Sequence, residues 1–184
     1  MRVISGTARG TKLFSVPGKK VRPTSDFVKE NLFNIIGTDV VSCAFLDCFA
    51  GMGGVGIEAL SRGASSVTFI DFNQDSLYAV HKNLEKTHLT NSATLIKAQM
   101  PQALQKLAGK QFDIIFLDPP YFDGLVPNVL IEIVRHDILH KGGQIIIELH
   151  SKTDAPDQFG LEIFKEKTYG NTRLVFMERA VDLL

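Results

Sequence analysis

The sequence has no hydrophobic run that approaches the roughly 18 consecutive apolar residues of a membrane-spanning helix. Its amino terminus also lacks the apolar core of a secretory signal peptide. These two absences predict a soluble, cytoplasmic protein. The chain has 184 residues, of which 45% are hydrophobic. A chain of this size forms one ordinary globular domain and buries roughly 70% of the surface of its unfolded form. We therefore expect a single domain over residues 1–184.

Cysteine is scarce, with only Cys43 and Cys48 in the chain. The two lie in one predicted strand at positions whose side chains point to opposite faces, so we expect no disulfide between them. We interpret both as small buried hydrophobic residues. None of the five histidines is spaced from these cysteines as zinc ligands are. The sequence therefore implies no metal site.

The chain also lacks a net charge, since 20 Lys+Arg residues balance 20 Asp+Glu residues. Taken alone, this balance argues against a nucleic-acid partner. The charges are unevenly distributed, however. Residues 1–36 hold seven basic and two acidic residues, a balance of +5, so the rest of the chain carries −5. This polarity predicts a basic lobe that contacts phosphates, attached to a neutral-to-acidic body. A solvated basic edge without a partner is the alternative.

The amino-terminal residues predict a small appendage over 1–37. Apolar residues flank a glycine-containing turn between Gly6 and Gly10, which predicts a β-hairpin over residues 1–16. Either Ser25 or Thr24 can cap a following helix, and Gly37 ends it. We expect the catalytic body to occupy residues 38–184.

The rest of the chain alternates between short apolar runs and helical segments. We expect strands at 44–48, 66–70, 93–97, 112–117 and 144–149, and helices at 54–62, 74–87, 101–108 and 125–139. Such alternation is typical of a parallel sheet with helices on both faces. Two further strands, at 161–169 and 173–179, have no helix between them and should pair antiparallel. The pattern predicts a doubly wound α/β fold, with a mostly parallel seven-stranded sheet that ends in an antiparallel hairpin.

A glycine-rich segment follows the first strand of this alternation. Gly51, Gly53 and Gly56 have the spacing of a dinucleotide-binding fingerprint, although glycines that only form a tight turn would give the same pattern. Asp47 stands before them, at the end of the strand. A pyrophosphate at this place would avoid a carboxylate, whereas a cofactor with a cationic amino group requires one. S-adenosylmethionine has such an ammonium group.

The ends of the next two strands supply further cofactor contacts. Asp71 ends the second strand, where an acid can accept both hydroxyls of a ribose, although it could instead cap the next helix. After the third strand, Gln99 can bond the adenine edge and Met100 can pack on its face. The predicted cofactor-binding residues are Asp47, Phe49, Ala50, Gly51, Gly53, Asp71, Gln99 and Met100.

The strongest motif is Asp118-Pro119-Pro120-Tyr121, directly after an apolar strand. The lone pair of an exocyclic amino nitrogen is delocalised into its base, so the nitrogen is a poor nucleophile until acceptors redirect that pair. The Asp118 carboxylate and the Pro119 carbonyl can each accept one N–H. The two prolines fix the backbone, and Tyr121 offers a ring on which an extruded base stacks. This motif predicts methylation of an exocyclic amino nitrogen.

With these motifs in view, the sequence resembles the RsmD-like bacterial family that methylates N2 of a guanine in 16S ribosomal RNA. The resemblance covers nearly the whole chain. It rests on four segments, namely Arg2–Gly6, Arg22–Asp26, Asp47–Ala64 and Asp118–Tyr121. The Asp-Pro-Pro-Tyr motif alone is shared with DNA adenine and protein glutamine methyltransferases. Its combination with the Arg-Pro-Thr segment and this glycine loop is more specific.

The resemblance implies a doubly wound methyltransferase fold, S-adenosylmethionine as the donor, and the small ribosomal subunit or its 16S RNA as the partner. It implies that Asp118, Pro119, Pro120 and Tyr121 are catalytic. It also places Arg22, Pro23 and Thr24 at the border of the cofactor and target-base pocket, and Arg9 and Lys12 in a hairpin that touches RNA. We expect the protein to act as a monomer.

Three other functions are compatible with parts of the sequence. DNA adenine-N6 methylation uses the same four-residue motif but usually needs an added target-recognition region. A nicotinamide-dependent oxidoreductase would explain the glycine spacing and Asp71, but neither Asp47 nor the Asp118 motif. A non-catalytic RNA-binding assembly factor would leave the intact Asp118 and Tyr121 without a role.

Overall fold

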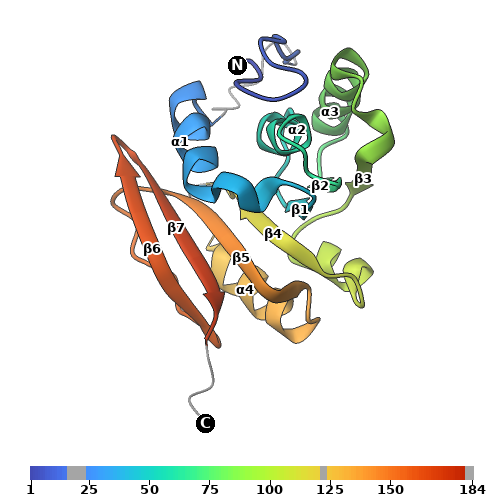
Figure 1. Cartoon of the computed structure of the whole chain (residues 1–184). Helices are drawn as coiled ribbons and strands as arrows, with labels where there is room; N and C mark the ends of the chain where they lie inside the picture. Colours follow the sequence, from blue (N-terminus) through green and yellow to red (C-terminus); the bar gives the residue numbers. More distant parts are fainter. Residues whose placement is uncertain (16–23, 121–123, 181–184) are drawn as a thin grey trace. The chain divides into compact units, whose positions relative to one another are not determined.

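The structure, a computed structural model, describes residues 1–15, 24–120 and 124–180. The chain divides into two compact units, Met1–Gln99 and Met100–Leu184. In Figure 1 the first unit runs from blue to green and the second from yellow-green to red. No helix among the described residues is long and apolar enough to cross a membrane.

The first unit contains three parallel strands in the order β3-β2-β1. Its elements in chain order are α1 (Asp26–Ile36), η1 (Gly37–Val40), β1 (Ala44–Asp47), α2 (Gly54–Ser61), β2 (Ser66–Asp71), α3 (Gln74–Thr87), η2 (Thr90–Ser92) and β3 (Ala93–Lys97). Asp47 on β1 pairs with Phe69 on β2, and Asp71 on β2 pairs with Lys97 on β3. The acids predicted at the ends of two strands therefore lie at the same, carboxyl-terminal edge of neighbouring strands.

The second unit has four strands in the order β4-β5-β7-β6. Its elements are η3 (Gln102–Leu107), β4 (Phe112–Leu117), α4 (Leu125–Arg135), β5 (Leu139–His150), β6 (Leu161–Tyr169) and β7 (Thr172–Arg179). Strands β4 and β5 are parallel, whereas β7 is antiparallel to both β5 and β6. The predicted carboxyl-terminal antiparallel hairpin is confirmed.

Helix α1 begins and ends as its sequence predicts. The Ser25 side chain accepts a hydrogen bond from the Val28 amide at 3.1 Å, which caps the first turn. At the other end, the Gly37 amide bonds to the carbonyl of Phe33. The buried face of the helix carries Leu32, Phe33 and Ile36. Ser25, and not Thr24, is therefore the cap.

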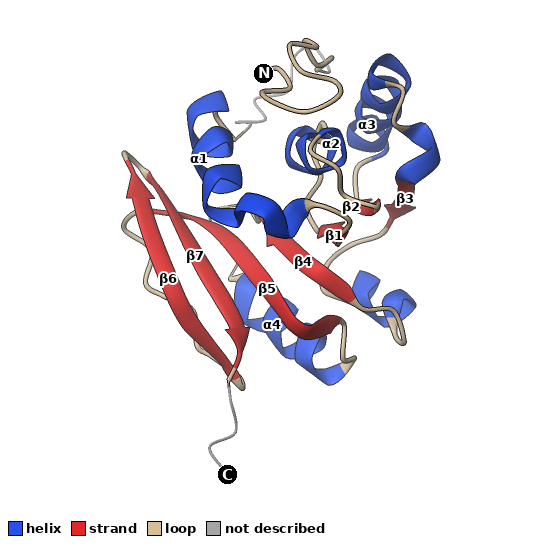
Figure 2. Ribbon diagram, viewed as in Figure 1, coloured by secondary structure: helices blue, strands red, loops and turns tan. Residues whose placement is uncertain are grey.

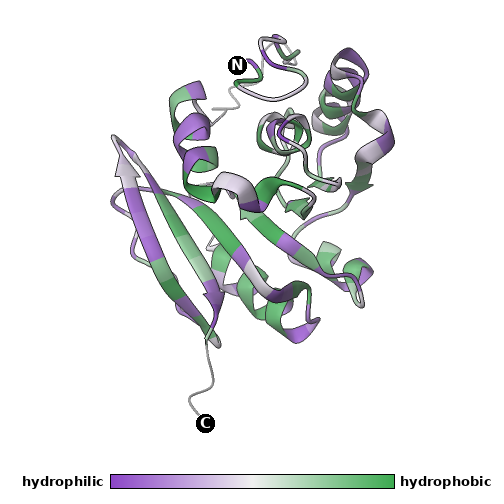
Figure 3. Ribbon diagram, viewed as in Figure 1, coloured by the Kyte–Doolittle hydropathy of each residue, from purple (hydrophilic) through white to green (hydrophobic). Residues whose placement is uncertain are grey.

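Apolar side chains from the strands form the core of each unit. In the first unit Phe45, Leu46 and Phe69 are completely buried. In the second unit, β5 and β7 bury the side chains of Ile146 and Phe176. Figure 3 shows β6 as largely hydrophilic, and its middle residues are exposed. A charged edge strand of this kind resists pairing with another chain.

Two predicted elements of the second unit have different bounds in the structure. The helix predicted at 101–108 is a short 3-10 helix, η3, because the stretch between Pro101 and Gly109 is too short for a stable α-helix. Strand β5 begins at Leu139, where the sequence predicted the end of a helix. Residues 140–143, which lie between the predicted helix and the predicted strand, belong to this strand, whose register against β4 shifts between Phe112 and Ile114.

The predicted amino-terminal hairpin is reduced to one antiparallel bridge, between Arg2 and Lys12. The Val3 amide bonds to the Thr11 carbonyl, and the Leu13 amide to the Met1 carbonyl. Figure 2 accordingly draws residues 1–15 as a loop. Several other backbone groups of this segment bond to side chains of α1, α2 and α3, and others form local turns, so a regular pair of strands does not form.

Cys43 and Cys48 are both buried free thiols. They flank β1 and do not lie within it, since the strand spans only Ala44–Asp47. Burial raises the pKa of the Cys48 thiol well above its usual value, and the nearby Asp47 carboxylate adds to this effect. The thiol therefore stays protonated and acts as a small hydrophobic group, as predicted.

Candidate active site

Asp47 is a buried carboxyl group at the end of β1, only 2% exposed. Its Oδ2 accepts a hydrogen bond from the Gly56 amide at 3.2 Å. Burial, with a smaller effect of the Asp71 charge, raises the pKa of Asp47 to about 7, against the lowering effect of hydrogen bonds from the Gly56 and Phe49 amides. Near neutral pH the neutral and charged forms of this carboxyl are therefore both populated. A cation placed beside it would favour the charged form.

The glycine segment makes a tight connection between β1 and α2. The Ala50 amide bonds to the Ile70 carbonyl of β2 at 2.9 Å, and the Gly53 amide bonds to the Ala50 carbonyl at 2.7 Å. A Cβ atom on Gly56 would lie 2.3 Å from Cε1 of Phe69, so only glycine lets α2 approach β2 this closely. The glycine spacing thus serves both the turn and the packing of the helix.

Asp71, at the end of β2, contacts the glycine segment directly. Its Oδ2 accepts the Gly51 amide at 2.9 Å and its Oδ1 accepts the Asn73 amide at 2.8 Å. Each carboxylate oxygen has more than one acceptor site, so both oxygens can also accept a ribose hydroxyl. Asp71 is half-buried. The structure therefore brings Asp47, Gly51 and Asp71 together, as the sequence predicted.

Phe72 is a candidate cofactor contact that the sequence analysis missed. Its side chain follows Asp71 directly and is 64% exposed, the largest exposure of any big apolar residue among those described. An exposed ring beside a ribose acceptor is well placed to cover an adenine. Gln99, predicted for that role, is exposed at the end of the first unit, and Met100 is buried at the start of the second. The signal in the sequence that could have identified Phe72 is its position directly after Asp71, the acid at the end of the strand.

The predicted catalytic motif follows β4 in the second unit. Ile114, Ile115, Phe116 and Leu117 of this strand are buried. Asp118 is half-buried, Pro119 is buried and Pro120 is exposed. Tyr121 lies outside the described residues. Asp118 thus directly follows a buried core strand and is itself only half-buried, which suits a group that must accept a hydrogen bond from a substrate.

Glu148 is a second acid that the sequence analysis did not single out. It lies on β5 and is only 4% exposed. Its neighbour Ile147 pairs with Leu117, the residue before Asp118. A carboxylate therefore occupies β5 one position beyond the point where β4 ends. The available signal in the sequence was an acid inside an otherwise apolar strand. Because Glu148 lies next to the end of the predicted strand at 149, its burial was not predicted.

A buried ionic network attaches the amino-terminal segment to α1 and α2. The fully buried Glu58 carboxylate accepts the Ile4 amide at 2.8 Å and the Ser5 amide at 3.0 Å. It also accepts Nε of Arg62 at 2.7 Å and lies 3.4 Å from Nζ of Lys29. Burial lowers the pKa of Lys29, against the opposing effect of Glu58. Arg62 further lies 4.9 Å from the centre of the Phe33 ring.

Asn83 of α3 joins the same amino-terminal segment to the glycine segment. Its fully buried side chain accepts the Phe14 amide at 2.6 Å and donates to the Phe14 carbonyl at 2.9 Å. It also donates to the Met52 carbonyl at 2.9 Å. Figure 1 shows the blue amino-terminal segment beside α2 and α3. The appendage is thus bonded to the part of the chain that carries the predicted cofactor contacts.

The predicted RNA-binding residues have different environments. Arg9 and Lys12 are exposed, which suits contacts with phosphates. Thr24 is only 5% exposed, so its side chain packs inside the protein. Arg22 and Pro23 lie outside the described residues. The roles of all five stay predictions.

Comparison with known families gives one match over almost the whole chain. Residues 1–178 match the family described as "Conserved hypothetical protein 95". A relative named "Putative rRNA methyltransferase YlbH", from Bacillus subtilis, is 37% identical over 182 residues, which cover 97% of this chain and 99% of the relative. The "Ribosomal RNA small subunit methyltransferase D" of Haemophilus influenzae is 32% identical, over 92% of this chain and 89% of its own.

Solved structures agree with the predicted fold class. A structure described as "Putative methyltransferase yhhF from Escherichia coli" matches with a TM-score of 0.85 and 31% identity, over 97% of both chains. A structure described as SMU.776, "a putative methyltransferase complexed with SAH", has a TM-score of 0.66 at 17% identity, and the match covers 83% of this chain and 49% of that one. The doubly wound methyltransferase fold predicted from the sequence is confirmed.

Proposed function

The chain belongs to the family of Conserved hypothetical protein 95, and on this premise we propose that it transfers a methyl group from S-adenosylmethionine to N2 of a guanine in 16S ribosomal RNA. The names of its relatives support an rRNA methyltransferase and, in several cases, one of the small subunit. The observation that carries the choice of an amino nitrogen is the half-buried Asp118, held by a core strand and followed by two prolines.

The residues at the edge of the first unit suit this donor. Asp47 would hold the ammonium of the methionine part, and this assignment explains why a carboxyl with a pKa of about 7 lies buried beside Asp71. Asp71 would accept the ribose hydroxyls and Phe72 would cover the adenine. When bound, S-adenosylmethionine supplies an electrophilic methyl group on a sulfonium. The backbone of Phe49, Ala50, Gly51 and Gly53 would line the methionine part.

Asp118 and Pro119 would prepare the target nitrogen. The carboxylate of Asp118 and the carbonyl of Pro119 each accept one N–H of the exocyclic amino group, which directs the nitrogen lone pair away from the base plane. Pro119 and Pro120 restrict the backbone so that this carbonyl stays in place. Tyr121 would stack on the extruded guanine. The methylated nitrogen then loses a proton, which the Asp118 carboxylate would accept or pass to solvent.

The proposed function is tested in cells that lack the gene. Their 16S RNA should lose one N2-methylguanosine, detected by nucleoside mass spectrometry, and a plasmid copy should restore it. A copy with Asp118→Ala should fail to restore it although the protein accumulates normally. An unchanged set of methylated nucleosides in the deleted strain would refute the proposal.

A further inference from the structure

Two exposed aromatic rings from distant parts of the first unit meet on its surface. Phe14 belongs to the amino-terminal segment and Tyr78 to α3; their side chains are 39% and 52% exposed. The ring centres are 6.4 Å apart and the planes are nearly perpendicular, at 84°. Rings that pack edge to face in this way keep part of their flat surface open. Two exposed rings in contact form a contiguous apolar surface, and such a surface is a candidate binding site.

Buried hydrogen bonds fix the position of Phe14. The Asn83 side chain bonds both the amide and the carbonyl of Phe14, so the backbone at this residue cannot rotate freely. Two residues earlier, the Lys12 carbonyl accepts a hydrogen bond from Nζ of Lys86 at 2.6 Å. The ring is therefore held in its exposed position before any ligand arrives, which lowers the entropy cost of binding.

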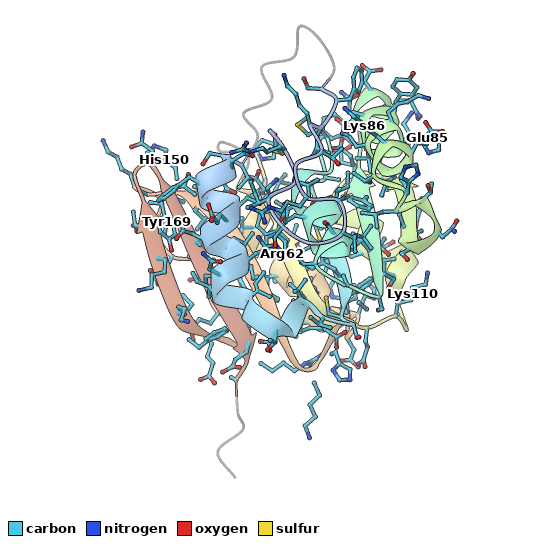
Figure 4. All side chains as sticks on the ribbon, turned by 45° about the horizontal axis from the view of Figure 1, so that its top comes forward. Arg62, Glu85, Lys86, Lys110, His150 and Tyr169 are labelled. Atoms are coloured by element: carbon cyan, nitrogen blue, oxygen red, sulfur yellow. The ribbon has the colours of Figure 1, made fainter. Side chains whose placement is uncertain are left out.

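Lysines of α3 and of the amino-terminal segment lie near the two rings. Tyr78, Lys82 and Lys86 are four residues apart and form one row along α3. Nζ of Lys82 lies 5.8 Å from the centre of the Tyr78 ring. Lys86 reaches toward the amino-terminal segment, where Lys12 is exposed; Figure 4 labels Lys86 on α3. Two acids lie on the same helix, Glu85, which bonds Lys82 at 2.9 Å, and Asp75 in its first turn.

We propose that Phe14 and Tyr78 of the first unit form a stacking surface for an unpaired base of the RNA substrate other than the target guanine, with Lys12 and Lys86 bound to the neighbouring phosphates. Flat rings flanked by lysines suit a base and its phosphates, since every base has a face on which a ring stacks. This inference rests on the proposed function for the identity of the ligand. It adds a second point of contact, which positions the RNA while its guanine is methylated.

The test compares binding and turnover in ring-replacing variants. Phe14→Leu and Tyr78→Leu keep an apolar side chain but remove the ring, and the double variant removes both. Phe164→Leu, at a 45% exposed aromatic residue on β6, is the matched control. The probes are naked 16S RNA and small subunits from cells that lack the enzyme. For each protein we would measure the RNA Kd, kcat, KM and S-adenosylmethionine affinity, and verify folding by thermal unfolding.

The double variant should bind both probes about 5- to 100-fold more weakly, the range expected for loss of base stacking. Its KM for RNA should rise by the same factor while kcat and cofactor affinity stay unchanged, and Phe164→Leu should behave as the parent. A Kd within twofold of the parent would overturn the inference, as would weaker binding to the particle alone, which would indicate a ribosomal protein as the partner.

The same measurements separate this inference from the proposed function. If the parent protein methylates guanine N2 but the double variant binds RNA as tightly as the parent, only the stacking surface is wrong. If the parent transfers no methyl group, yet the double variant binds RNA more weakly than the parent, the stacking surface stands and the proposed function fails.

Discussion

At the scale of single residues, the burial of Asp47 destabilises the folded protein when the carboxyl is charged, and this environment suits a role in binding. The folded protein raises the pKa of this carboxyl from 3.8 to about 7, mainly because of burial. Asp47 therefore favours the folded state only while it is protonated, and this contribution is lost as the pH rises from about 4 to about 7. A cationic ligand beside the carboxylate would offset the free energy lost when Asp47 ionises.

Asp47→Asn should stabilise the protein without cofactor and weaken its affinity for S-adenosylmethionine. The gain in unfolding free energy should grow between pH 4 and pH 7 and level off above, reaching at most about 4 kcal/mol for a pKa shift of this size. Urea unfolding at pH 5, 6, 7 and 8, with calorimetry for cofactor binding, measures both effects. A stability gain independent of pH would show that Asp47 does not titrate in this range.

Asp118→Ala should reduce kcat by about 100-fold or more while cofactor affinity stays nearly intact. The carboxylate accepts a hydrogen bond from the target nitrogen as its charge develops, so the interaction is made mainly in the transition state. Single-turnover methylation and equilibrium cofactor binding separate the two quantities. Equal losses of binding and turnover would assign Asp118 a structural role.

At the scale of elements, the sequence predicted the core strands and most helices because their signals are local. Helix α1 has its cap at Ser25 and its stop at Gly37, and β1 and β2 are apolar runs of ordinary length. The predictions were wrong where tertiary contacts, and not local sequence, determine the secondary structure. Residues 139–143 belong to β5 despite two glycines, with Leu139 paired to Phe112 of β4, and the amino-terminal segment bonds to α2 and α3 in place of forming a regular hairpin.

The candidate site was predicted to a similar extent. Asp47, Gly51 and Asp71 follow from the rule that strand ends converge at one edge of a parallel sheet, and the structure joins them. Glu58 and Asn83 were not predicted, because a buried polar residue in a helix looks like any solvent-facing one. Only their partners in residues 4–14 reveal that they hold the appendage.

Gly6→Ala should detach the amino-terminal segment from α2. Gly6 has a φ of +84°, and a Cβ there would lie 1.7 Å from the Ser61 carbonyl oxygen, so the segment would have to move. The control is Gly10→Ala, where φ is +83° but nothing lies within 4 Å. The control should lose only about 1–2 kcal/mol of stability from backbone strain.

Hydrogen exchange of residues 1–15, with urea unfolding, distinguishes the two glycine variants. Gly6→Ala should lose protection across the segment and at least about 1 kcal/mol more stability than Gly10→Ala. RNA affinity should fall with it. Equal behaviour of the two variants would mean that the close contact between Gly6 and Ser61 does not hold the segment.

At the scale of the whole molecule, the chain forms two compact units that meet in sequence at Gln99 and Met100. The division predicted at residue 37 is a different one, between an amino-terminal appendage and the body of the domain. That the whole chain forms a single domain stays a prediction. The uneven charge is a property of the entire chain, since residues 1–36 carry +5 and the remainder −5. It implies that RNA approaches the amino-terminal residues first.

Reversal of Arg9, Lys12 and Arg22 to glutamate should weaken RNA binding and flatten its salt dependence. Each lost phosphate contact should make the slope of log affinity against log salt shallower by about 0.7 to 0.9. The control reverses Lys110, Lys165 and Lys167, which are exposed in the second unit, and so changes net charge equally. Filter binding between about 50 and 200 mM salt measures the slopes. Identical slopes in both triple variants would remove the basic lobe from the account.

The most direct test of the central claim is transfer of labelled methyl from S-adenosylmethionine to small subunits isolated from cells that lack the enzyme. The RNA is then digested and its nucleosides separated. We expect label in N2-methylguanosine of 16S RNA, dependent on Asp118. Label in N6-methyladenosine would contradict the proposed substrate and retain the amino-nitrogen chemistry. The absence of label from RNA, with cofactor and RNA both bound, would contradict the claim that the protein is a methyltransferase of this RNA.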